Sequence, residues 1–136
     1  MAGLRLGYCL TADGDLLERM SACSQPWNVS VPAQAAGIAA LGQKDFLERA
    51  RAVIREERPR LKAGLEELGY RVCPSEANYL LFRGPEDLGE KLRRQGIALR
   101  SCANYHGLGP GWFRTAVRTR EENERLLAAA KPAGEE

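Results

Sequence analysis

Two arginines stand out as side chains that could bind an anion together. Arg100 lies in the predicted strand 97–102, and Arg114 lies in the predicted strand 112–118. The glycine-rich loop 103–111 joins these strands, and strands joined by one loop are usually neighbours in a sheet. Two guanidinium groups repel each other unless an anion lies between them, and each can bind a carboxylate or phosphate through two hydrogen bonds. The pattern indicates a site for a ligand with one or two anionic groups.

A simpler interpretation stays open for each candidate side chain. Arg100 and Arg114 could each pair with a surface carboxylate, and the strand pattern alone favours that interpretation. Arg5, which lies between two leucines, could be an ordinary charge at a strand edge. Asn78 is polar within an apolar strand and could be a core amide with satisfied hydrogen bonds. The loop 101–111 could offer backbone N–H groups to an anion or be a plain connector, and it lacks the G-x-x-x-x-G-K-[ST] motif of nucleotide loops.

The cysteines and the histidine do not indicate a metal site. Four cysteines stand at positions 9, 23, 73 and 102 without a C-x-x-C spacing, and the only histidine is His106. A structural zinc site is not expected from this spacing. The pattern favours reduced thiols in a cytoplasmic protein. A catalytic pair of Cys102 and His106 is conceivable, but no other feature of the sequence supports it.

Length, composition and charge favour one soluble domain. The chain has 136 residues, of which 44% are hydrophobic, and its net charge is +2. Charges of both signs alternate without a basic block, which argues against a nucleic-acid binder. The longest uncharged stretch, 20–43, contains prolines and polar residues, so no membrane span is expected. No signal peptide is visible at the start of the chain.

The first half of the chain predicts one strand and three helices. Alternating leucines predict a strand over 3–11, although no partner strand is near it in sequence. Two short helices follow over 13–24, with Asp13 as N-cap, and over 32–41. A long helix is predicted over 44–68, where Pro59 should introduce a kink or a break because proline has no N–H to donate.

The second half of the chain predicts a small sheet with covering helices. Thr119 and Glu122 form a capping box that begins the last helix. An earlier helix is predicted over 85–95. The expected strands are 70–73, 77–83, 97–102 and 112–118. These elements predict a two-layer α/β sandwich, with a small, largely antiparallel sheet and helices on one face.

Six ordered motifs span most of the chain: A-G-L-R-L-G-Y (2–8), P-W-N-V-S (26–30), P-A-Q-A-A (32–36), S-E-A-N-Y-L-L-F (75–82), G-I-A-L-R-S-C-A-N-Y-H-G-L (96–108) and F-R-T-A-V-R-T-R-E-E-N (113–123). Together they resemble the class I/II aminotransferases, which are pyridoxal-phosphate enzymes of fold type I. The resemblance covers about 2–130. It implies that 13–131 is the small C-terminal domain of such an enzyme, that 1–12 is a strand left from the large cofactor-binding domain, and that 132–136 is a tail.

The resemblance implies roles for four residues. Arg5 matches the arginine that holds the phosphate of pyridoxal 5'-phosphate. Arg114 matches the arginine that binds the substrate carboxylate, and Arg100 matches a second substrate-binding arginine used with phosphorylated substrates. Asn78 lies on a strand near the family's active site and is a substrate-binding candidate without a definite role. No metal site is implied.

The motifs fall within two related branches of the family. They resemble the histidinol-phosphate aminotransferases and, through R-x-C-x-N-Y-x-G-L at 100–108, most closely the threonine-phosphate decarboxylases of cobalamin biosynthesis. The Schiff-base lysine of the family lies a few residues before the position of Arg5. The resemblance therefore implies that this lysine is upstream, that no residue of this chain is catalytic, and that the chain alone is inactive. It also implies a parent homodimer that includes the missing N-terminal large domain and acts on a small anionic amino acid. A standalone anion-binding or interaction module is the alternative.

Overall fold

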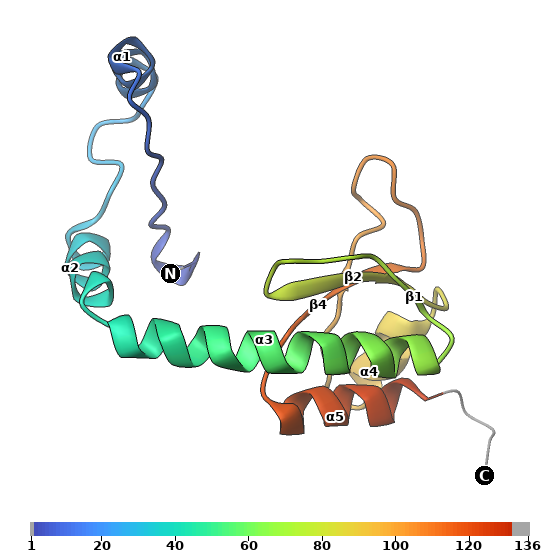
Figure 1. Cartoon of the computed structure of the whole chain (residues 1–136). Coiled ribbons are helices and arrows are strands. Elements are labelled where there is room, and N and C mark those ends of the chain that lie inside the picture. Colours follow the sequence, from blue (N-terminus) through green and yellow to red (C-terminus); the bar gives the residue numbers. More distant parts are fainter. Residues whose placement is uncertain (1, 132–136) are drawn as a thin grey trace. The chain divides into compact units, whose positions relative to one another are not determined.

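The computed structural model describes residues 2–131, which form two compact units that divide between Leu47 and Glu48. The first unit holds a short 3-10 helix η1 (Ala2–Leu4), the helices α1 (Gly14–Ala22) and α2 (Val31–Leu41), and the start of α3 (Lys44–Glu67). The second unit holds the rest of α3 and the sheet (Figure 1).

Side-chain caps begin both helices of the first unit, and both helices were predicted. The Asp13 carboxylate accepts a hydrogen bond from the Leu16 N–H at 3.0 Å. The Ser30 hydroxyl accepts one from the Ala33 N–H at 3.3 Å, and Pro32 occupies the first turn of α2. Each cap satisfies a backbone donor that the helix itself leaves without a partner.

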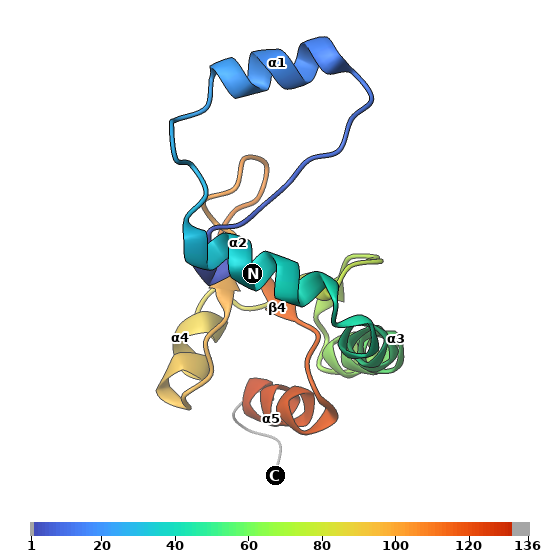
Figure 2. The ribbon, with the colours of Figure 1, turned by 90° about the vertical axis from the view of Figure 1, so that its left-hand side faces the viewer.

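The strand predicted over 3–11 is wrong. Arg5 instead has a positive φ of 55° directly after η1. A strand needs a hydrogen-bonded neighbour, and none of the described residues of the first unit forms a strand. Figure 2 shows α1 standing apart from α2, joined to the rest by two long connecting segments. The segments on either side of α1 are exposed to solvent: Leu10 before the helix is 89% exposed, and Trp27 after it is 98% exposed.

Of the kink or break predicted at Pro59, the break is wrong, because α3 continues from Lys44 to Glu67 (Figure 1). Pro59 removes the hydrogen bond to the Arg55 carbonyl, but both residues lie on the exposed side of the helix. Water can satisfy that carbonyl there. On the other side, Leu61 and Leu65 are buried in the core and hold the following turns in place.

The second unit contains an antiparallel sheet with the strand order β1-β2-β4-β3. Its strands are β1 (Arg71–Val72), β2 (Tyr79–Arg83), β3 (Arg100–Ser101) and β4 (Trp112–Ala116). All four were predicted, but β3 is shorter than expected. Ile97 donates its N–H to the Leu92 carbonyl at 2.9 Å, so this residue closes the preceding helix instead of extending the strand.

Helices α3, α4 (Leu88–Arg94) and α5 (Arg120–Ala130) lie on the same side of this sheet (Figures 1 and 2). Their apolar side chains meet those of β2 and β4 in one core. Its buried members include Leu61, Leu65, Leu80, Phe82, Leu88, Leu92 and Phe113. The predicted two-layer α/β sandwich is confirmed. Within 2–131, no helix is both long and apolar enough to cross a lipid bilayer.

Candidate anion-binding site

Arg100 and Arg114 lie directly opposite each other on β3 and β4. Their Cα atoms are register partners, and both side chains are exposed. On β4 the neighbours Phe113 and Thr115 are buried, so Arg114 points away from the core. The adjacency expected from the sequence is confirmed, and it places two like charges at one cross-strand position, which destabilises a sheet.

Neither arginine has the carboxylate partner that the simpler interpretation required. Among residues 2–131, no ion pair or side-chain hydrogen bond involves Arg100 or Arg114. Each guanidinium instead lies over an aromatic ring: Arg114 is 5.0 Å from the Tyr79 ring centre, and Arg100 is 5.8 Å from that of Tyr105. The rings hold the arginines in place while leaving their N–H groups free to bind an anion.

A hollow of about 440 Å³ brings three predicted residues together. Asn78, Arg100 and Arg114 all line it. Asn78 is exposed and is not a core amide, but its backbone carbonyl accepts a 2.9 Å hydrogen bond from the Val117 N–H. That bond continues the pairing of β2 with β4 beyond the last ladder residues. Among the described residues, no side-chain hydrogen bond involves the Asn78 amide, so this group is available at the hollow.

Glu122 is the one carboxylate among the described residues that line this hollow, and its charge is already compensated by hydrogen-bond donors. Glu122 accepts a hydrogen bond from Arg118 Nε at 2.8 Å, and the hydroxyl and N–H of Thr119 also donate to it, as the predicted capping box requires. The hydrogen bond from Arg118 is the main cause that lowers the pKa of Glu122 to about 2. Glu122 therefore does not compete for Arg100 or Arg114.

We expect Glu122→Gln to change the acid dependence of stability. Because the pKa of Glu122 is lower in the folded chain, its ionised form adds stability above the unfolded pKa near 4.3, and this contribution disappears as the pH falls to about 2. The difference in melting temperature between the original chain and Glu122→Gln should be larger at pH 6 than at pH 2. A difference independent of pH would contradict the Arg118–Glu122 assignment.

The loop after β3 has a backbone that requires glycine at its end. Gly111 has a φ of 83°, and a Cβ there would lie 2.7 Å from the Gly84 carbonyl oxygen. Cys102 begins this loop and is completely buried, whereas His106 is exposed. The conceivable Cys102–His106 catalytic pair is therefore not formed.

Arg5, the candidate for the cofactor phosphate, belongs to the first unit. Its side chain is exposed and makes no ion pair or side-chain hydrogen bond among residues 2–131. It is thus free to bind an anion. The backbone of Arg5 is in the left-handed region, and glycines stand two residues before and two residues after it in the sequence.

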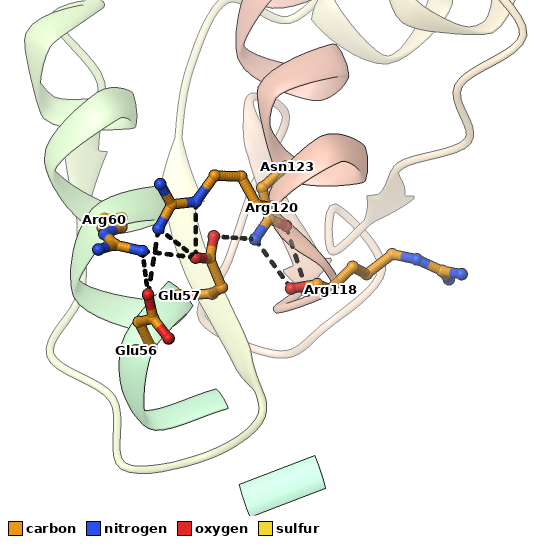
Figure 3. Close-up of polar contacts among 6 residues, drawn as sticks. All are labelled: Glu56, Glu57, Arg60, Arg118, Arg120 and Asn123. Carbon is orange, nitrogen blue, oxygen red and sulfur yellow. Dashed lines mark hydrogen bonds and ion pairs between the residues drawn. The ribbon is translucent and has the colours of Figure 1, made fainter. Parts of the chain in front are cut away.

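A buried polar cluster next to the hollow was not predicted from the sequence. Glu57 of α3 is only 5% exposed, and its carboxylate accepts hydrogen bonds from Arg60, Arg120 and Asn123 at 2.9–3.3 Å (Figure 3). Asn123 also bonds to both the N–H and the carbonyl of Arg118, which lines the hollow. Through these contacts, Glu57 joins α3 to α5 and positions one wall of the site.

The helix pattern contains the signal for this cluster. The apolar face of α3 has a seven-residue gap between Ile54 and Leu61, and Glu57 falls on that face at positions i+3 and i−4. A carboxylate on a core-facing position must have partners. The sequence could not say which residues these are, because Arg120 and Asn123 are more than sixty positions away.

Comparison with known proteins adds family relationships. The family described as aminotransferase class I and II matches residues 1–129. A histidinol-phosphate aminotransferase of Anaeromyxobacter sp. is 44% identical over 133 residues, and a threonine-phosphate decarboxylase of Salmonella typhimurium is 41% identical over 133 residues. Each alignment covers 95% of this chain but 36% of the relative, so the chain spans about a third of the length of these relatives.

Two solved structures resemble the fold. The histidinol-phosphate aminotransferase from Clostridium acetobutylicum matches with a TM-score of 0.85 and 31% identity, over 96% of this chain and 41% of that chain. The L-threonine-O-3-phosphate decarboxylase from Porphyromonas gingivalis matches with a TM-score of 0.72 and 25% identity, over 87% of this chain and 38% of that chain.

Proposed function

Since the chain belongs to the aminotransferase class I and II family, we propose that it provides the substrate-binding part of a pyridoxal-phosphate enzyme. The substrate class is a small amino acid or amino alcohol that carries a phosphate. The relatives' names support this class, because both histidinol phosphate and threonine phosphate are phosphorylated amino compounds. A homodimer, a cytoplasmic location and a missing N-terminal large domain remain predictions from the family resemblance.

The observation that carries the proposal is the cross-strand pair of Arg100 and Arg114. These two arginines have no carboxylate partner among residues 2–131, and both line one hollow of about 440 Å³. In the proposed complex, one arginine binds the substrate phosphate and the other binds and orients its carboxylate. Asn78, on the wall of the same hollow, can donate or accept a further hydrogen bond.

Arg5 fits the role of holding the phosphate of the family's cofactor, because it is exposed and without a carboxylate partner among residues 2–131. Pyridoxal phosphate, when bound, supplies the electron sink that makes bond cleavage at the substrate's α-carbon possible. The contribution of this chain is to bind the two phosphates and to orient the substrate.

Threonine-phosphate decarboxylation is our first candidate reaction. Threonine phosphate carries both a phosphate and an α-carboxylate, which suits two free arginines, whereas histidinol phosphate carries no carboxylate. The motif R-x-C-x-N-Y-x-G-L at 100–108 supports the same branch. Transamination of histidinol phosphate is the second candidate, because several of the similar relatives carry that name.

Two assays distinguish the decarboxylation from the transamination. A full-length protein that contains this chain, supplied with pyridoxal phosphate and threonine phosphate, should release carbon dioxide. The comparison assay uses histidinol phosphate with 2-oxoglutarate. Efficient transamination there without carbon dioxide release from threonine phosphate would assign the reaction to the aminotransferase branch.

We expect the chain of residues 1–136 by itself to form no stable covalent product with pyridoxal phosphate. No lysine of residues 2–131 lines the hollow of Arg100 and Arg114, so no amine is positioned beside an anion bound there. The measurement is the visible absorbance that survives gel filtration, followed by borohydride reduction and peptide mapping. One lysine modified stoichiometrically would show that this expectation is wrong.

A further inference from the structure

A second hollow lies at the opposite edge of the sheet, beside β1 and β2. Its volume is about 730 Å³, which is within the range of small-molecule sites. It shares no lining residue with the hollow around Arg114. Three cationic side chains line it: Arg71, Arg83 and Lys91.

Arg71 and Arg83 repeat the arrangement of the first pair. Their Cα atoms are register partners across β1 and β2, and both side chains are exposed. Val72 and Phe82 beside them are buried, so the two arginines point away from the core. Among residues 2–131, neither arginine makes an ion pair, so no direct carboxylate contact offsets the repulsion between them.

The rest of the lining contains one negative charge and an apolar wall. Among the described residues, Asp87 is the only acidic residue of the lining, which also contains three cationic residues. Tyr70 donates its hydroxyl to the Ala130 carbonyl, and burial, followed by the charge of Asp87, raises the pKa of Tyr70. Tyr70 therefore stays neutral. Tyr70 and Leu88 are buried in the core, so the apolar surface of the lining comes from Leu68 and Pro85.

We propose that this hollow is a second anion site, which binds a small phosphate monoester with an apolar group. The two arginines paired across β1 and β2 match the planar geometry and double charge of a phosphate group. Lys91 of α4, which donates to the Lys131 carbonyl, adds positive charge to the lining. The neighbouring apolar side chains suit the group that the phosphate esterifies. The site is separate from the substrate hollow and does not depend on the proposed reaction.

The test uses the chain of residues 1–136 and phenyl phosphate as the probe. Titration followed by ¹⁵N NMR should shift the amide signals of Gly69 and Gly84, which line the hollow. Arg71→Gln and Arg83→Gln should each weaken binding by about tenfold, as expected for loss of one charge-assisted contact. Arg93→Gln is the matched control, because Arg93 is exposed on α4 and paired with Glu90. It should change the dissociation constant by less than about twofold.

Further variants and ligands distinguish specific binding at this site from nonspecific electrostatic attraction. Arg100→Gln should leave the Gly69 and Gly84 shifts unchanged, and benzoate, with a single charge, should bind more weakly than phenyl phosphate. Unchanged melting temperatures for the exposed-arginine variants would show that the fold is retained. The proposal is overturned if the probe shows no saturable binding here, if Arg93→Gln weakens it as much as Arg71→Gln, or if benzoate binds equally well.

Discussion

Replacing Arg114 with alanine is expected to lower kcat/KM of the full-length enzyme by roughly 100-fold or more. The reason is the loss of a charge-assisted, two-bond contact to the substrate worth ~3 kcal/mol. Arg114 is exposed and lies over the Tyr79 ring, so its removal should not disturb the core. The measurement is the initial rate with threonine phosphate over a range of concentrations, with circular dichroism to confirm the fold.

Two further variants define what the Arg114 side chain contributes. Arg114→Lys keeps the positive charge but loses the planar fork, so we expect a smaller loss of about tenfold. Arg94→Ala serves as control, because Arg94 is an exposed arginine of α4 that contacts Glu90. It should leave kcat/KM within about twofold of the original value. Unchanged kcat/KM in Arg114→Ala would contradict the proposed substrate contact.

Replacing Glu57 with alanine is expected to cost about 2–3 kcal/mol of the free energy of unfolding. The change removes the shared acceptor of Arg60, Arg120 and Asn123 (Figure 3). Asn123 is only 4% exposed, so its amide loses a partner where water does not easily replace it. The two arginines are half exposed and can be solvated, which keeps the cost below that of a fully buried ion pair.

Glu56 offers a matched control one residue away. It pairs with the same two arginines, Arg60 and Arg120, but its side chain is 61% exposed. Glu56→Ala should therefore cost less than about 1 kcal/mol. Urea unfolding can be followed through the fluorescence of Trp112, which is half-buried, because Trp27 is already exposed in the folded chain. Equal losses for the two variants would show that burial of Glu57 is not what stabilises the α3–α5 contact.

Local signals predicted the helices and strands of the second unit well. Apolar spacing located α3, the Thr119–Glu122 capping box located the start of α5, and alternation located β2 and β4. These signals depend on residues a few positions apart, so they are readable without the fold. The family resemblance is confirmed by the match over residues 1–129.

Predictions failed where the outcome depended on a distant partner. The apolar alternation of 3–11 is typical of a strand, but a strand forms only beside another strand. Pro59 is tolerated in α3 because the helix presents it to solvent while the core holds the turn after it. For β3, the N–H of Ile97 is taken by the end of α4, so the ladder begins only at Arg100.

The sequence by itself predicted a small α/β sandwich with Arg100 and Arg114 on adjacent strands, and its motifs resembled the class I/II aminotransferases. Alternation and loop length suffice to predict the two adjacent strands, because both act over short distances. Only the tertiary structure decided that these arginines have no carboxylate partner among residues 2–131, that Arg71 and Arg83 form a similar pair, and that Glu57 is buried against α5. Partner choice depends on which surfaces the packed helices and sheet bring together, and side chains far apart in sequence carry no local signal of it.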